Sequence, residues 1–316
     1  TETLNARKAS VESVKRTVTL GFIVSYFDLL EVEKMITVAE KEVESLTSYL
    51  NDMEHLYEQG VIVENDLLPA KVRLADAKQK FIAAVNKRET AAAGINTMLT
   101  IPLTENINTQ DVNVDIPVLP ELSDAWNSAQ AKRPEILFFN KQIKSSILRE
   151  RAKSVQNLPT VFVDAGYAYT QNQYMVHEDD TYVKFGAKMD LYDGGATGAE
   201  IMKERYLHKK LQEQKSKIVE DIRYEVKRSF LGLKDAMEKL GVAKGALLQA
   251  EENVRFYRVK YNNGVATTTD VLEAINLQTK AETNYYSADY ELKRSQAKLM
   301  YSIGNDLSAM YKKTEE

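Results

Sequence analysis

The chain has 316 residues, a net charge of -4, no cysteine, and only 13 glycines and 6 prolines. Without cysteine it has no disulfide or thiolate metal site, and its interspersed charges lack the basic patch that nucleic-acid binding needs. No run of about 18 apolar residues could cross a bilayer as a helix. The few helix breakers leave long uninterrupted stretches, which predict a mainly α protein with unusually long helices.

Residues 1–100 read as a first helical hairpin that turns at Gly60. Asp66 follows the turn and is placed to cap the second helix at its N-terminus. A strict seven-residue step of small residues then follows, at Ala70, Ala77, Ala84 and Ala91. This step predicts left-handed supercoiling with close helix approach, as in a coiled-coil wall. An ordinary antiparallel bundle is the alternative.

Residues 101–122 read as a small mixed collar, because prolines surround a run at 111–116 that alternates like a short strand. A solvated linker would have a similar composition. Residues 123–158 predict two helices leading onward, one from near Ser123 and one from Arg133-Pro134-Glu135.

Residues 159–195 change to a period of two. Val161, Val163 and Ala165 point one way, with Phe162 as an exception on the opposite, mostly polar face, and a second alternating run extends from Val183 to Leu191. Two such strands predict a transmembrane-type β-hairpin. An amphipathic hairpin packed on a soluble core is the alternative. The intervening cluster 177–180 reads as an acidic surface loop, with cation binding as the second possibility.

Residues 196–316 repeat the first hairpin and end in a C-terminal collar segment. A helix from Ala199 to Tyr261 would be roughly 90 Å long. An offset of 204 residues carries Tyr57, Gly60 and Asp66 onto Tyr261, Gly264 and Asp270. The expected fold is therefore mainly α, with two repeated long antiparallel helical hairpins, a short β-hairpin and a small collar.

The turn Tyr261–Val265 with its copy at 57–70, the Arg133-Pro134-Glu135 helix start and Leu191-Tyr192-Asp193-Gly194-Gly195 together resemble the TolC family of outer-membrane efflux proteins. The resemblance implies a homotrimer in the cell outer membrane that extends into the periplasm, with four strands per protomer in a shared barrel. It also implies a periplasmic adaptor protein and an inner-membrane pump as partners. Because the repeat places a partner for the 159–195 hairpin upstream of Thr1, the chain is expected to be truncated at its N-terminus.

The resemblance assigns Asp270 and Glu273 to an acidic pore constriction, with Asp66 as their counterpart through the internal repeat. Carboxylate rings from three chains would repel one another and attract cations. Helix N-capping is the alternative for Asp66 and Asp270, and Glu273 could at most complete a capping box begun by Asp270.

The resemblance also assigns adaptor binding to the two turns, at Gln59, Gly60, Val61, Asn263, Gly264 and Val265. A positive φ would by itself explain both glycines. Ala266 stands where the family often has a basic residue, so no closing salt bridge is expected there.

The expected function is a passive export duct in a tripartite efflux or type I secretion system. No enzyme, cofactor or metal site is predicted, because His55, His177 and His208 are scattered and no phosphate loop or nucleophile motif occurs. The alternative function is a soluble coiled-coil scaffold or interaction protein.

Overall fold

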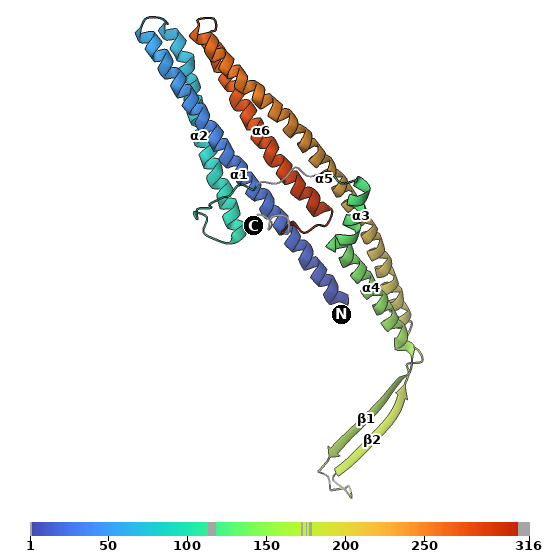
Figure 1. Ribbon diagram of the computed structural model, residues 1–316. Coiled ribbons are helices and arrows are strands. Elements are labelled where there is room, and N and C mark those ends of the chain that lie inside the picture. The colour runs from blue at the N-terminus through green and yellow to red at the C-terminus, as the bar shows by residue number, and fades with distance from the viewer. Residues whose placement is uncertain (1, 113–117, 172, 175, 177–178, 309–316) are drawn as a thin grey trace, which may run out of the picture. The chain divides into compact units, whose positions relative to one another are not determined.

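The computed structural model describes residues 2–112, 118–171, 173–174, 176 and 179–308 (Figure 1). Its long helices are α1 (Glu2–Glu58), α2 (Glu64–Leu99), α5 (Ala196–Asn262) and α6 (Thr268–Ser302). Two shorter helices, α3 (Leu122–Lys132) and α4 (Pro134–Ser154), precede a 3-10 turn (Val155–Asn157) and the antiparallel strands β1 (Thr160–Tyr169) and β2 (Asp179–Lys188). The predicted fold class, with two long helical hairpins and one short β-hairpin, is confirmed.

The chain divides into two compact units. The strand unit contains the residues up to Glu12 and Pro134–Asp221, and the hairpin unit contains Ser13–Arg133 and the residues from Ile222 onward. Both helical turns, at Gly60 and Gly264, belong to the hairpin unit. The two units are described separately below.

The long helices of the hairpin unit pack through seven-residue seams. In α5 the buried and half-buried positions follow steps of three and four from Ile222 to Tyr261, which is the pattern of a coiled-coil seam. The predicted small-residue step faces inward in α2 and α6, where the buried members are Ala70, Ala77, Ala274, Ala281 and Ser295. Small side chains at these positions allow close approach of the helix backbones.

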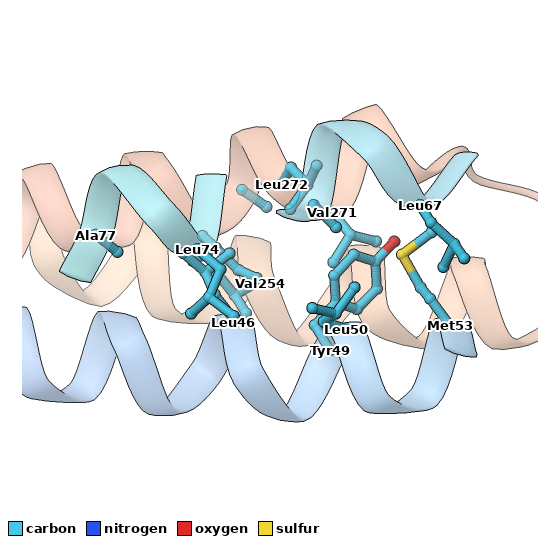
Figure 2. Close-up of a cluster of buried hydrophobic side chains, with 13 residues drawn as sticks. Leu46, Tyr49, Leu50, Met53, Leu67, Leu74, Ala77, Val254, Val271 and Leu272 are labelled. Atoms are coloured by element: carbon cyan, nitrogen blue, oxygen red, sulfur yellow. The ribbon is translucent and has the colours of Figure 1, made fainter. Parts of the chain in front are cut away.

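One buried cluster joins all four long helices near the two turns (Figure 2). Leu46 and Leu50 come from α1, Leu74 from α2, Val254 from α5 and Val271 from α6. Fully burying a leucine or valine side chain contributes about 1.5–3 kcal/mol. The cluster therefore fixes the two turns side by side at one end of the hairpin unit, as the internal repeat requires.

The segment after α2 is held against the long helices by polar side chains. The amide of Asn96, a fully buried residue, donates to the carbonyls of Leu103 and Glu105 at 3.2 and 2.9 Å. Asp111 lies 3.3 Å from the ammonium of Lys34 and 3.4 Å from that of Lys293. Burial opposes ionisation of Asp111, but the two lysines hold the pKa of its carboxyl below the ordinary value.

The predicted strand at 111–116 lies mostly outside the described residues. Residues 111–112 and 118–121 form neither helix nor strand. The cluster predicted at 177–180 is likewise described only from Asp179, which begins β2.

Arg133 anchors the junction between α3 and α4 and is only 6% exposed. Its guanidinium donates to the Glu225 carboxylate at 2.9 Å and stacks over the Tyr301 ring at 4.9 Å. These two contacts join the end of α3 to α5 and α6. Removing one partner of a buried ion pair leaves an uncompensated charge, which is strongly destabilising.

In the strand unit, β1 and β2 pair over their full length in an antiparallel register. Phe162 lies opposite Gly186, and a Cβ on that glycine would meet the phenyl ring at 2.5 Å. Tyr182 covers Gly166 in the same way. Phe162, the apolar exception on the mostly polar face, is therefore an aromatic ring that covers a glycine of the opposite strand. β2 ends at Lys188, earlier than the predicted end at Leu191.

The apolar face of this β-hairpin is not buried. Val161, Val163 and Phe185 are 77, 63 and 79% exposed. Within the strand unit, no core of described residues covers these side chains. The described part of the chain also contains no helix apolar and long enough to cross a membrane.

Gly304 and Gly232 provide a test of the fold. Gly304 has φ +87°, and a Cβ there would lie 2.6 Å from the Lys132 Cβ. We expect Gly304→Ala to lower the free energy of unfolding by roughly 2–4 kcal/mol, from left-handed strain and overpacking. Gly232→Ala is the control, because a Cβ in this α5 position meets nothing within 4 Å, and it should raise stability by about 0.5–1 kcal/mol. Urea denaturation measures both, and equal stabilities would contradict the packing described.

Candidate functional site

The two helical turns have the same hydrogen-bonded geometry. At the first, the N–H of Gly60 donates to the Tyr57 carbonyl and that of Val61 to the Leu56 carbonyl, each at 2.9 Å. Gly264 and Val265 repeat the pattern with Tyr261 and Lys260, also at 2.9 Å. This is the Schellman motif, and it places glycine in the left-handed region, here with φ of 69° and 70°. Both glycines therefore have the positive φ that would by itself explain their presence.

The second turn leads into a complete helix cap. Thr267 is the N-cap of α6, and its hydroxyl accepts from the backbone N–H of Asp270 at 3.3 Å. Asp270 in turn accepts from the Thr267 backbone N–H at 2.8 Å and from its hydroxyl at 2.7 Å. These reciprocal bonds form a capping box. The bonds from Thr267 hold the pKa of the Asp270 carboxyl below its ordinary value.

The first turn leads into a weaker cap. The N-cap of α2 is Val63, whose side chain has no acceptor. The N–H of Asp66 donates only to the Val63 carbonyl, at 2.9 Å, whereas the N–H of Asp270 contacts both the carbonyl and the hydroxyl of Thr267, at 3.1 and 3.3 Å. Asp66 still accepts from the Val63 backbone N–H, at 3.3 Å. The expectation that Asp66 and Asp270 are themselves N-caps is therefore wrong. Both stand three positions later and bond back to the cap residue.

Glu273 lies outside this hydrogen-bonding system. The capping box is formed by Thr267 and Asp270, so the reach-back contact that was the most Glu273 could contribute to a cap is not present. Its side chain is exposed, and it makes no ion pair or side-chain hydrogen bond with the described residues. The position equivalent to Glu273 in the first hairpin is Pro69, inside α2. The acidic pair of the second hairpin is therefore reduced to the single carboxylate of Asp66 in the first.

The structure brings the three predicted constriction residues to one end of the hairpin unit. Leu67 and Val271, which directly follow Asp66 and Asp270, belong to the same buried cluster. Both aspartates are half-buried and Glu273 is exposed. The arrangement concentrates acidic charge where the hairpins turn.

The turn residues themselves remain open to solvent. Val61 and Val265 are 65 and 71% exposed, although they are apolar. Gln59 and Asn263 are also exposed. Two matching apolar side chains at one end of the hairpin unit provide a surface that another protein could cover.

Among the described residues, no three histidine or acidic side chains come together as a metal site would need. His55 lies 3.7 Å from Glu58, while His208 is half-buried beside the Ser146 hydroxyl at 3.3 Å. His177 lies outside the described residues.

Comparison with known proteins decides the family. A model of the family described as outer membrane efflux protein matches residues 1–100 and 125–305. The chain belongs to the outer membrane efflux protein family. Membership places this efflux protein in the outer membrane, in a channel family and not in an enzyme class.

One relative matches in sequence and two solved structures match in fold, all at low sequence identity. Toxin and drug export protein A of Aggregatibacter actinomycetemcomitans is 20% identical over 305 residues, which are 91% of this chain and 64% of that protein. The chain thus spans less than two thirds of this relative. The solved outer-membrane channel OprN has a TM-score of 0.82 at 18% identity, and the match covers 96% of this chain and 70% of OprN. The outer membrane protein VceC from Vibrio cholerae has a TM-score of 0.80 at 12% identity, and the match covers 96% of this chain and 74% of VceC.

Sequence reasoning missed two structural residues of this efflux protein, and the first is the cap Thr267. Its signal is present, because a threonine three residues before an aspartate is a capping-box pattern. It also missed Tyr49, whose ring packs against that of Tyr261 at 5.5 Å. The repeat gives no hint of this contact, since the residue 204 positions after Tyr49 is Asn253.

The unequal caps predict opposite effects of reciprocal substitutions. Val63→Thr should supply the missing hydroxyl and stabilise the start of α2, while Thr267→Val should destabilise the start of α6, each by about 1 kcal/mol. Hydrogen exchange of the first-turn amides in α2 and α6 measures both effects. Exchange that changes in the same direction in the two variants would show that the cap hydroxyl does not control these helix starts.

The lowered pKa of Asp270 predicts a pH dependence. A carboxyl with a depressed folded pKa stabilises above its unfolded pKa of about 3.9, and this stabilisation disappears as the pH falls through the folded value. The wild type should therefore be more stable than Asp270→Asn at neutral pH, and the difference should shrink only below about pH 4. Urea denaturation between pH 7 and pH 2 tests this, and a pH-independent difference would refute it.

Proposed function

We propose that the complete efflux protein is the passive outer-membrane duct of a tripartite efflux or type I secretion system. Several copies, three in the proposed homotrimer, would share one wall built from the paired hairpins. The substrate is moved by an inner-membrane pump, and a periplasmic adaptor contacts the turns at Gln59–Val61 and Asn263–Val265. The wall itself needs only to form a closed, water-filled path.

The observation that supports this proposal most directly is the unpaired acidic charge at the tip, the end of the hairpin unit where both turns lie. Glu273 is exposed and has no partner among the described residues, whereas Asp270 is engaged in a cap. In a ring of three copies, the Glu273 carboxylates would face one another across a narrow opening together with Asp270 and Asp66. Rings of carboxylates select and retain cations in channels.

The exposed strand hairpin supports the same assembly. Its apolar side chains are of the kind that contact lipid when several hairpins share a wall. A coiled-coil scaffold in solution would leave these side chains in water at a cost of about 25 cal/mol per Å² of apolar surface. Membership in the efflux family likewise favours the duct over the scaffold.

Block by divalent cations tests the constriction. In planar bilayers, the complete protein should conduct and be blocked by Mg²⁺ from the periplasmic side. Glu273→Gln should raise the blocking concentration severalfold, because it removes one carboxylate per copy from the ring. Glu251→Gln is the matched control, since Glu251 is also exposed but lies in α5 well away from the turn. Unchanged block in Glu273→Gln would remove this residue from the constriction.

A further inference from the structure

The turn between α5 and α6 (Figure 1) contains the only Asn-Gly step of the sequence, at Asn263-Gly264. Asparagine is a thermolabile residue, and a following glycine favours loss of its side-chain ammonia because no Cβ hinders approach of the glycine nitrogen. Asn263 is exposed. Outside its chain neighbours, nothing lies within 4 Å of the position that a Cβ on Gly264 would take. The reacting pair is therefore open to water and free of steric cover.

The reaction needs only the chain and water. The backbone nitrogen of Gly264 attacks Cγ of Asn263, and the new N–Cγ bond closes a succinimide ring. The amide nitrogen leaves as ammonia, which takes up the proton that the attacking nitrogen loses. Water then opens the ring at either of its carbonyls, so the product is aspartate or isoaspartate. The balance is one water consumed and one ammonia released.

The closed turn keeps the two reacting groups engaged elsewhere. The N–H of Gly264 donates to the Tyr261 carbonyl at 2.9 Å. The side-chain amide of Asn263 is directed back along α5 and donates to the Val259 carbonyl at 2.8 Å. The ring can therefore close only after these two bonds break, that is, after the turn opens.

Opening of this turn is not resisted by buried packing. Residues 262–265 are all exposed, and they follow directly on the last turn of α5. Helix ends and exposed turns open at a small fraction of the free energy of global unfolding. The hydrogen bonds thus slow the reaction without preventing it.

The first turn provides a comparison with the same geometry. Gln59-Gly60 stands at the equivalent position, and Gly60 and Gly264 have φ of 69° and 70°. The N–H of Gly60 donates to the Tyr57 carbonyl at 2.9 Å, as that of Gly264 does to Tyr261. The glutamine side chain is one methylene longer, so the ring it would have to close is larger and forms more slowly. The two turns therefore differ in reactivity and not in backbone conformation.

The product of the reaction is a poorer end to α5. The last carbonyls of a helix favour hydrogen-bond donors and positive charge. A carboxylate at position 263 cannot donate to the Val259 carbonyl, and it places negative charge at the negative end of the helix dipole. Isoaspartate also lengthens the backbone within the turn, which disturbs the spacing on which the Schellman bonds depend.

We propose that Asn263 is a deamidation site, which reacts when the turn opens and whose products hold the turn less firmly. Ammonia is lost from this position in preference to the neighbouring asparagines. The proposal does not depend on the duct, because it concerns the chemistry of one turn within a single chain.

Peptide mapping of the complete protein after prolonged incubation near neutral pH tests the site. Trypsin cleavage after Lys260 and Lys280 releases residues 261–280, which also contain Asn262 and Asn276 as internal controls. Fragment masses should locate the change from amide to carboxyl at Asn263, at a level severalfold above the other two. Gln59 should remain unmodified over the same period.

Reciprocal substitutions separate the side chain from the turn. Asn263→Gln should abolish the modification, and Gln59→Asn should create a reactive site in the first turn. Both variants keep an amide side chain, so the charge of each turn is unchanged. Absence of modification at Asn263, or equal modification of Asn262 and Asn276, would overturn the site. An unreactive Gln59→Asn variant would overturn the claim that this turn geometry permits the reaction.

The role of turn opening has its own measurement. A synthetic peptide of residues 261–280, in which α5 is absent, should lose ammonia severalfold faster than the folded protein. Equal rates would overturn the protection by the two hydrogen bonds. Asn263→Asp, which reproduces one product, should exchange the amide hydrogens of Gly264 and Val265 severalfold faster than the wild type does. Unchanged exchange would overturn the claim that the product loosens the turn.

Discussion

The structure depends on a small buried cluster in which four helices meet just below two turns. Leu46 and Leu50 of α1, Leu74 of α2, Val254 of α5 and Val271 of α6 are excluded from water together (Figure 2). Hydrophobic burial is non-directional, so the cluster alone could not fix one arrangement. The seven-residue spacing of small residues supplies the direction, because only one face of each helix permits close approach. Everything proposed for the tip follows from these two conditions.

The two hairpins are copies in backbone geometry but differ in their side chains. Both turns have glycine at positive φ, and in both the two turn N–H groups donate to carbonyls at equivalent positions of the preceding helix. The second has a threonine cap and an unpaired glutamate, while the first has Val63 and Pro69 at the equivalent positions. The two hairpins thus share the glycines and hydrogen bonds that the backbone of the turn requires. They differ in the side chains that a second chain or an ion would contact. This division explains why one hairpin carries more of the proposed constriction.

Much of the fold was predictable from the sequence because its signals are local and periodic. Glycine at a turn, proline at the first position of α4 and alternation in β1 each follow from backbone sterics or side-chain period. The helix starts were less predictable, because a carboxylate at Asp66 or Asp270 suits both the cap position and the third position after it, and only Thr267 separates the two. The pairing of Phe162 with Gly186 depends on strand register, which alternation leaves open. The Tyr49–Tyr261 contact depends on how two distant hairpins meet, which no local signal encodes.

The central claim is that both turns lie side by side at one end of the hairpin unit, so that identical tips can surround one opening. Spin labels on Gln59→Cys and Asn263→Cys, in protein diluted with unlabelled copies, measure this separation within one chain. The account predicts a distance of about 20 Å, or two helix spacings of 8–10 Å. A distance of about 50 Å, the length of a 35-residue helix such as α6, would place the turns at opposite ends and contradict it.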